Sequence, residues 1–203
     1  MPLIRLNNGG YRYPGTDKWI FRGLEFAADA GEAVRLVGRN GSGKTTLLKV
    51  LTGILPLTEG SLKKGPHTRA AYMDQFAGEM LARDLTIAEQ FKMATQPAND
   101  AASLGADPLV QFNIGLQHRT TDFVGYLSGG QQQVIALLST LLAGANLLCL
   151  DEFASSLDGQ SAAVAGRLLE HARTAAKAAL ILVGHGSIGT HVDREFCAPL
   201  VES

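Results

Sequence analysis

The sequence predicts an α/β fold whose core is a mainly parallel sheet. Short apolar runs of strand length, at residues 33–37, 146–150 and 180–183, alternate with stretches in which apolar residues recur at helical spacing. Strands that alternate with helices are typical of a parallel sheet covered on both faces. The 203 residues suffice for one globular unit with a substantial core and an inserted subdomain.

The first third of the chain is expected to hold strands and one helix. Residues 4–6 and 19–26 have the composition of strands, and a Pro-Gly turn at Pro14 separates them. A helix from about Lys44 should end near Gly53, because glycine is favoured just after a helix. Residues 58–69 are expected to form a short polar connection.

Later segments follow the same alternation. A strand at residues 70–73 leads to Asp74 and Gln75, and residues 76–121 are predicted to be a helical insertion with proline and glycine breakers. Ser128 is expected to start a helix that runs to about residue 142, with Gln131 completing a capping box. A further helix is expected over residues 159–176.

Composition and hydropathy give little support to a broad nucleic-acid surface, although a local basic patch stays open, or to a membrane span. Lysine and arginine total 18 against 19 acidic residues, so the net charge of -1 does not favour a broad nucleic-acid surface. Residues 134–150 are almost wholly apolar but fall short of the roughly 20 residues of a membrane span, which favours a buried helix and strand. Cys149 lies in an apolar strand, where a buried thiol is usual, and a reducing cytosol fits best.

A phosphate-binding loop is the strongest motif. Gly38 and Gly43 flank a four-residue spacer and Lys44-Thr45 follows, between a strand and a helix start. Glycines let backbone N–H groups point inward, and a helix N-terminus favours a phosphate. We therefore expect Lys44 to reach the β- and γ-phosphates and Thr45 to bind magnesium. The nucleotide-binding set is Gly38, Arg39, Asn40, Gly41, Ser42, Gly43, Lys44, Thr45 and Thr46.

Two carboxylates follow the apolar strand that ends at Leu150. Parallel sheets bind ligands at the carboxyl ends of their strands, where Asp151 and Glu152 stand. Asp151 suits magnesium, directly or through water, and Glu152 suits polarising a water that attacks the γ-phosphate.

A third motif reveals a family resemblance. Residues 127–133, Leu-Ser-Gly-Gly-Gln-Gln-Gln, resemble the signature of ATP-binding cassette (ABC) ATPases, and the order of the three motifs matches that family. The resemblance covers almost the whole chain. It implies a P-loop NTPase fold with an N-terminal antiparallel β part and an inserted α-helical subdomain. Residues 1–75 and about 122–203 would form the nucleotide-binding core of a single ABC ATPase domain.

The resemblance also implies roles for individual residues. Tyr13 resembles the aromatic that stacks on adenine, although Tyr11 is close enough to compete. Gln75 resembles the glutamine that approaches magnesium and the attacking water, and His185 the histidine that contacts the γ-phosphate. The signature residues Ser128, Gly129, Gly130 and Gln131 would hold ATP bound to a second subunit, and Asp158 resembles the loop that crosses the dimer interface.

These roles imply an Mg²⁺-dependent ATPase that works as a dimer. Its partners would be another ABC ATPase subunit, in a homodimer or heterodimer, separate transmembrane permease subunits that meet residues 75–91 and, for an importer, a solute-binding protein. It would be cytoplasmic and peripheral on the inner face of the cell membrane. No fused C-terminal regulatory domain and no nucleic-acid partner are expected.

Two other readings stay open. The chain could be a soluble ABC-type ATPase that acts on ribosomes or nucleic acid, or a nucleotide-binding module without turnover. Two departures from the family pattern are Phe153-Ala154, where Pro-Thr is usual, and Gly186, where aspartate is common. Neither replaces a group needed for hydrolysis.

Overall fold

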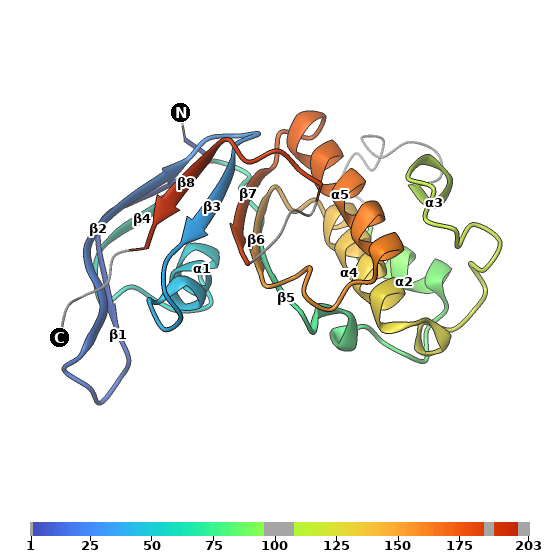
Figure 1. Ribbon diagram of the computed structural model, residues 1–203, viewed down its shortest axis with the longest axis horizontal. Helices are drawn as coiled ribbons and strands as arrows, with labels where there is room; N and C mark the ends of the chain where they lie inside the picture. Colours follow the sequence, from blue (N-terminus) through green and yellow to red (C-terminus); the bar gives the residue numbers. More distant parts are fainter. Residues whose placement is uncertain (1, 96–107, 185–188, 199–203) are drawn as a thin grey trace.

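Two sheets form the framework of the protein in a computed structural model that describes residues 2–95, 108–184 and 189–198 (Figure 1). The first is antiparallel, with the order β2-β1-β4, and the second is parallel, with the order β5-β6-β7-β3-β8. The antiparallel strands are β1 (Ile4–Arg12), β2 (Trp19–Ala28) and β4 (Glu59–Lys64). The parallel strands are β3 (Ala33–Val37), β5 (Ala70–Asp74), β6 (Leu147–Asp151), β7 (Ala179–Val183) and β8 (Arg194–Cys197).

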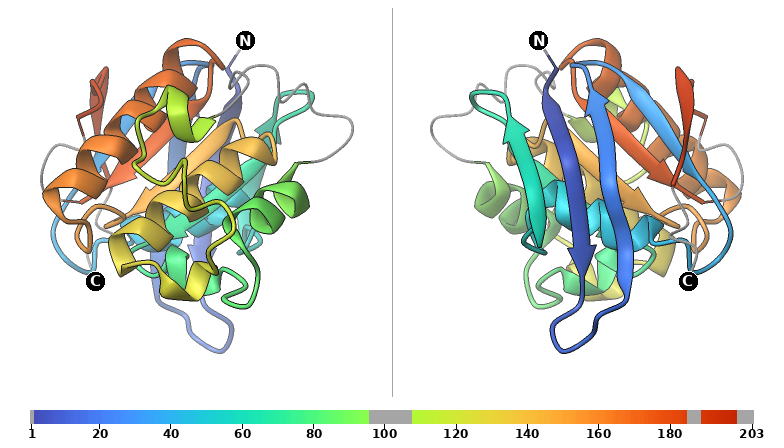
Figure 2. Two further views of the ribbon diagram at one scale, coloured as in Figure 1. Left: turned by 90° about the vertical axis from the view of Figure 1, so that its right-hand side faces the viewer. Right: turned by 90° about the vertical axis from the view of Figure 1, so that its left-hand side faces the viewer.

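Helices cover both faces of the parallel sheet. Helix α1 lies between the two sheets, and α4 and α5 pack on the opposite face of the parallel sheet (Figure 1); the right-hand view of Figure 2 shows β1, β2 and β4 in front of α1. The helices are α1 (Lys44–Thr52), α2 (Ile87–Ala94), α3 (Pro108–Gln111), α4 (Gly129–Leu142) and α5 (Gly159–Thr174), with short 3₁₀ turns η1 (Ala77–Met80) and η3 (Val124–Tyr126). The prediction of an α/β fold is confirmed.

The strands of the parallel sheet divide their side chains between two apolar clusters. In β6, Leu147 and Cys149 face α1 and the antiparallel sheet, whereas Leu148 and Leu150 face α4 and α5. All four side chains are at most 1% exposed. Alternate residues point to opposite faces of a strand, so a strand buried on both faces needs an uninterrupted apolar run. Burial also raises the pKa of the Cys149 thiol to about 12, consistent with a structural rather than a reactive cysteine.

The apolar stretch before Asp151 is a helix and a strand, as expected. Helix α4 takes its first part and β6 its second. No helix of the described residues is long and apolar enough to cross a membrane. The predicted capping box is present, because the Ser128 hydroxyl accepts from Gln131 N–H and the Gln131 side chain accepts from Ser128 N–H.

One prediction was wrong: residues 58–69 are not simply a polar connection. Residues 59–64 form β4, which pairs with β1 through Leu6 and Leu62. Glu59 and Leu62 are half-buried, and the other four residues of this strand are exposed. An exposed edge strand with two lysines lacks the apolar signal that identifies buried strands.

Candidate functional site

The loop between β3 and α1 has the backbone of a phosphate cradle. Gly38, Gly41 and Gly43 have φ values of 152°, 80° and 85°. A Cβ at Gly38 would lie 2.7 Å from Ser42 Oγ, and a Cβ at Gly43 would lie 2.6 Å from Ile20 Cγ2. Gly38 and Gly43 are thus favoured on both conformational and steric grounds, and Gly41 on conformational grounds alone. The loop therefore curls closely enough for its N–H groups to surround an anion.

Polar side chains of this loop fit a phosphate group. Lys44 Nζ donates to the carbonyl oxygens of Gly38 and Arg39 at 2.8 and 3.0 Å. This holds the ammonium group over the loop. Ser42 Oγ is buried and has no hydrogen-bond partner. A phosphate oxygen in the loop would give the orphaned hydroxyl an acceptor and the ammonium a counter-charge.

A second group of oxygens fits magnesium. Thr45 Oγ1 donates to Asp151 Oδ2 at 2.6 Å, which joins the start of α1 to the end of β6. A cavity of about 310 Å³ holds this pair. It is lined by Ile20, Asn40, Gly41, Gly43, Lys44, Thr45, Thr46, Asp151, Glu152 and Val183. Magnesium prefers oxygen ligands and usually takes only one or two carboxylates beside phosphate and water, so Thr45 and Asp151 suit it.

Glu152 lines the same cavity and has an unusual backbone conformation. Its φ is 50°, a left-handed value that is rare for a non-glycine residue. Its N–H donates to the carbonyl of Val183 at 2.9 Å, which holds the residue against the end of β7. A Cβ at Gly184 would lie 3.0 Å from Glu152 Oε2, so the glycine leaves room for the carboxylate. Strain of this kind is typical of functional sites.

Gln75 lies in the turn after β5 and contacts the loop that follows Glu152. Its Oε1 is 2.9 Å from Ser155 Oγ, and its carbonyl accepts from Ser156 Oγ at 3.1 Å. The same turn is bonded to α4 through the buried side chain of Gln133. The structure thus joins Gln75 to both the loop after Glu152 and the signature helix.

The signature residues stand at the start of α4, where some are exposed and one is buried. Ser128 and Gly129 are exposed, and no atom lies within 4 Å of a Cβ built on Gly129. Gly130 is buried, where a Cβ would lie 2.7 Å from Ser161 Oγ and 3.0 Å from Asp158 Oδ2. Asp158 caps α5 by accepting from Ser161 N–H at 2.8 Å, which lowers the pKa of its carboxyl. The N-termini of two helices therefore meet at this surface.

Among the described residues, the phosphate loop lines one cavity and the signature lines another. Ser128, Gln131 and Asp158 line a small separate pocket. The starts of α1 and α4 lie in different parts of the molecule (Figure 1). His185 lies outside the described residues.

The two candidate tyrosines differ in accessibility. Tyr11 is 4% exposed, whereas Tyr13 is 43% exposed. Their rings meet edge to face, with centroids 5.1 Å apart. The Tyr13 hydroxyl lies 3.2 Å from Thr46 Oγ1, which places its ring beside the phosphate loop. Tyr13 therefore has the better position for stacking on a base.

Comparison with known proteins agrees with this geometry. The model of the ABC transporter family matches residues 21–155, which include the phosphate loop, the signature and the carboxylate pair. The chain belongs to this family. ABC ATP-binding proteins bind ATP and are, in general, ATPases.

Several ABC proteins with assigned roles resemble the chain along most of its length. The zinc import ATP-binding protein ZnuC of Ruegeria sp. is 32% identical over 91% of this chain and 72% of its own length. The lipoprotein-releasing system ATP-binding protein LolD of Nitratidesulfovibrio vulgaris is 32% identical over 91% and 86%. The cytochrome c biogenesis ATP-binding export protein CcmA of Rhodopseudomonas palustris is 29% identical over 92% and 94%.

A solved structure shows the same fold. The ATP-binding subunit of an ABC transporter superposes with a TM-score of 0.74 at 24% identity, covering 90% of this chain and 79% of that one. The expected P-loop NTPase architecture of an ABC ATPase, with a parallel core sheet and an N-terminal antiparallel sheet, is confirmed.

Two residues at this site make contacts that the sequence does not indicate. Tyr72 donates from its hydroxyl to Asp151 Oδ2 at 3.0 Å, and burial together with this carboxylate raises the pKa of its phenol. Gln133 bridges α4 and the turn that carries Gln75. A tyrosine in a strand and a glutamine in a polar run have no periodic or spacing signal of their own.

Proposed function

We propose that this chain is the ATP-hydrolysing subunit of an ABC transporter. It converts ATP and water to ADP and phosphate in the presence of Mg²⁺, and it powers solute movement through separate transmembrane permease subunits. The observation behind this proposal is the hydrogen bond between Thr45 and Asp151 in a cavity that also contains Lys44 and Glu152. A phosphate-binding lysine, a magnesium-binding pair and a carboxylate for water are the groups that phosphoryl transfer to water requires.

Each group has a distinct task in this reaction. Lys44 and the loop N–H groups bind the β- and γ-phosphates, and Thr45 and Asp151 would hold magnesium, which would supply positive charge beside the phosphates. Glu152 orients the attacking water and accepts its proton. Gln75 helps to place that water, and His185 contacts the γ-phosphate. Tyr13 stacks on the adenine ring.

The exposed signature completes the site of a second copy. A helix N-terminus attracts negative charge, and Ser128 and Gly129 stand exposed at the start of α4. In a head-to-tail dimer, Ser128 to Gln131 of one subunit hold the γ-phosphate bound to the other, and the loop around Asp158 crosses the interface. ATP then joins two chains, and hydrolysis releases them. The chain as a whole acts as one ABC ATPase domain, with residues 76–121 as its helical insertion.

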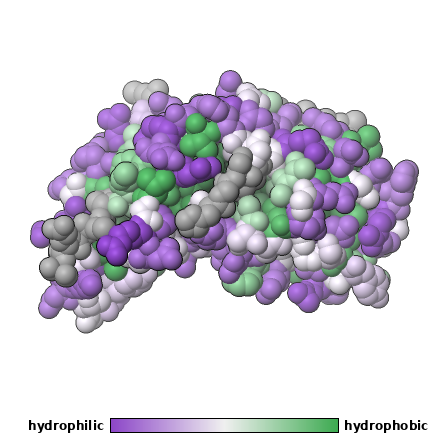
Figure 3. Space-filling model, viewed as in Figure 1, coloured by the Kyte–Doolittle hydropathy of each residue, from purple (hydrophilic) through white to green (hydrophobic). Residues whose placement is uncertain are grey.

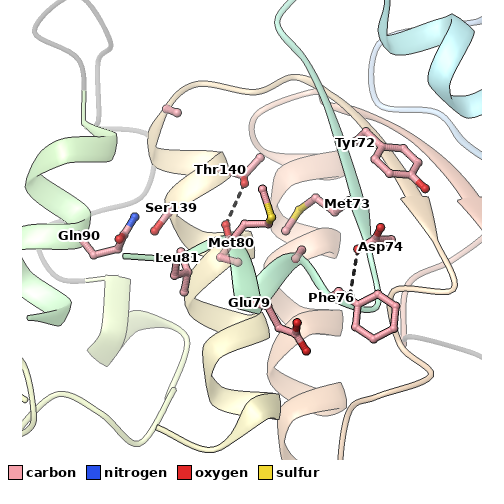
Figure 4. Close-up of a pocket in the computed structure, with 13 residues that line it drawn as sticks. Tyr72, Met73, Asp74, Phe76, Glu79, Met80, Leu81, Gln90, Ser139 and Thr140 are labelled. Carbon is pink, nitrogen blue, oxygen red and sulfur yellow. Dashed lines mark hydrogen bonds between the residues drawn. The ribbon is translucent and has the colours of Figure 1, made fainter. Parts of the chain in front are cut away.

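A groove beside α4 suits a segment of the permease. Its volume is about 600 Å³, and η1, α2 and α4 contribute to its walls (Figure 4). Phe76 and Met80 at this groove are 53% and 87% exposed. Two other lining residues, Gln90 and Ser139, each have a buried side-chain oxygen without a hydrogen-bond partner. Exposed apolar side chains at the edge of a groove favour the apolar face of an amphipathic helix as its occupant.

The surface also bears on where the chain works. The face in Figure 3 is mostly hydrophilic, with smaller hydrophobic patches. A peripheral position on the cytoplasmic side of a membrane, held by permease subunits, fits this surface and the groove. The relatives named above serve zinc import, lipoprotein release and cytochrome c biogenesis export, so the proposal extends to transport but not to a solute or a direction.

Two measurements test the function. Purified protein should release phosphate from ATP only with Mg²⁺, and Lys44→Ala should lose this activity. The products of neighbouring genes should include a membrane protein that co-purifies with the chain. The Met80→Glu variant should no longer co-purify with that membrane protein. ATP turnover without a membrane partner, together with ribosome co-sedimentation that survives moderate salt, would favour the soluble alternative. Nucleotide binding without any turnover would favour the non-hydrolysing module.

A further inference from the structure

Two hydroxyl groups from different elements converge on one oxygen of Asp151. The Thr45 hydroxyl, at the start of α1, donates to Oδ2 at 2.6 Å, and the Tyr72 hydroxyl, from β5, donates to the same Oδ2 at 3.0 Å. Two donors on one carboxylate oxygen fix the plane of the carboxylate and satisfy that oxygen. The other oxygen, Oδ1, is then the one that can turn toward magnesium or its water.

Tyr72 is well held for this task. Its backbone is paired with Cys149 in the parallel sheet, two residues before Asp151 on the neighbouring strand. Lys49 of α1 places its ammonium 5.5 Å from the centre of the ring. The aromatic ring has few rotamers, so a hydroxyl anchored by a strand and a helix keeps its position.

We propose that Tyr72 is a positioning residue for magnesium, acting through Asp151. This inference rests on the proposed function, because it requires that Asp151 serve the metal. Groups that hydrogen-bond to a metal-binding carboxylate orient it, and their removal typically weakens metal affinity by about 10-fold or more. Tyr72 does not touch the nucleotide in this account, so ATP binding without metal does not depend on its hydroxyl.

The same residue belongs to the wall of the groove beside α4. Tyr72 lies at the edge of that groove, and Figure 4 shows its ring turned away from Met80 and Ser139. The ring instead reaches toward the magnesium-binding carboxylate, to which its hydroxyl donates. The hydrogen bond between Tyr72 and Asp151 connects the two sites.

Electron paramagnetic resonance can measure how tightly Mn²⁺ binds to the protein in the presence of ATP. This affinity separates a positioning role of Tyr72 from a merely structural one. Tyr72→Phe removes the hydroxyl and keeps the ring. We expect its Mn²⁺ affinity to fall by about 10-fold, while the affinity for a fluorescent ATP analogue in EDTA stays within about twofold of wild type. Tyr126→Phe is the matched control, because Tyr126 is 76% exposed on η3 and does not line the metal cavity. It should bind Mn²⁺ as wild type does.

A third variant distinguishes failure of the inference from failure of the function. Asp151→Asn should lose most of its Mn²⁺ affinity. Wild-type Mn²⁺ affinity in folded Tyr72→Phe, together with a defect in Asp151→Asn, would overturn the role of Tyr72 alone. Wild-type affinity in both would overturn the magnesium site itself. Circular dichroism and the unfolding midpoint establish that each variant is folded.

Discussion

The side-chain amide of Gln133 donates a hydrogen bond of 2.6 Å to the backbone carbonyl of Asp74. Its oxygen accepts a second bond, of 2.7 Å, from Gly78 N–H, and the side chain is 2% exposed. A Cβ at Gly78 would lie 2.7 Å from Gln133 N, so this turn presses directly on α4. The turn that carries Gln75 and the helix that begins with the signature are therefore one connected body.

Loss of the Gln133 amide should impair turnover more than binding. Gln133→Met keeps the length of the side chain but leaves two buried backbone groups unpaired, which should lower the free energy of unfolding by about 1–3 kcal/mol. With Gln75 less firmly placed, kcat should fall severalfold while KM for ATP stays near wild type. Gln132→Met is the control, because its buried amide bonds to the carbonyls of Val124 and Leu127 instead. Equal effects of the two variants on kcat would contradict a special role of Gln133.

The left-handed backbone conformation of Glu152 should lower the free energy of unfolding. A non-glycine residue in the left-handed region costs about 1–2 kcal/mol, and Glu152 has a φ of 50°. The free energy of unfolding of Glu152→Gly should therefore exceed that of Glu152→Ala by about 1 kcal/mol. Both variants lack the carboxylate and should be inactive. Denaturant unfolding of the pair measures the difference. A less stable glycine variant would show that the residue is not strained.

Base stacking should depend on Tyr13 and not on Tyr11. Tyr13→Ala is expected to weaken ATP binding by about 10-fold, the magnitude of an aromatic stacking contact with a base. Tyr13→Phe keeps the ring and should bind nearly as wild type does. Tyr11→Phe, at a residue that is 4% exposed, should leave the affinity unchanged. Calorimetric titration with ATP decides between them, and the reverse pattern would assign the base to Tyr11.

Acid should destabilise the protein partly through Glu170. Hydrogen bonds from Arg173 and from the Thr190 hydroxyl lower the pKa of this carboxyl from 4.5 to about 2. A carboxylate with a depressed pKa stabilises the fold fully above its unfolded value, and this stabilisation is lost as pH falls from about 4.5 to 2. Glu170→Gln should lower stability at pH 7 by up to about 1 kcal/mol, as for partly exposed ion pairs. The difference from wild type should shrink at pH 3, and a constant difference would exclude this linkage.

Sequence patterns predict the buried elements well because burial imposes a pattern. Strand β6, helix α4 and its capping box at Ser128 all follow from local composition and spacing. Strand β4 does not, because pairing with β1 rather than burial makes it a strand, and the paired residues Leu6 and Leu62 lie far apart in the sequence. Strand β8 at the sheet edge, with alternating half-buried and exposed residues, was missed for the same reason.

Some parts of the candidate site can likewise be predicted from the sequence, and others cannot. The phosphate loop and the carboxylate pair are contiguous, so their spacing reveals them. The contacts of Tyr72 and Gln133 join segments that are about 55–80 residues apart, and only the folded chain shows them. Phe153, which departs from the family pattern, is fully buried in the cluster beside α4 and α5 and is therefore a core residue.

In the proposed function, ATP joins two copies of this chain until Glu152 promotes hydrolysis. Glu152→Gln keeps the size and polarity of the side chain but cannot accept the proton of the attacking water. Light scattering after size-exclusion chromatography, with Mg²⁺ and ATP, measures the mass of the variant, and a phosphate assay measures its turnover. We expect the variant to form an ATP-bound dimer without turnover, and we expect this dimer to dissociate when ATP is replaced by ADP. A variant that remains monomeric with ATP, or one that hydrolyses ATP at the wild-type rate, would contradict it.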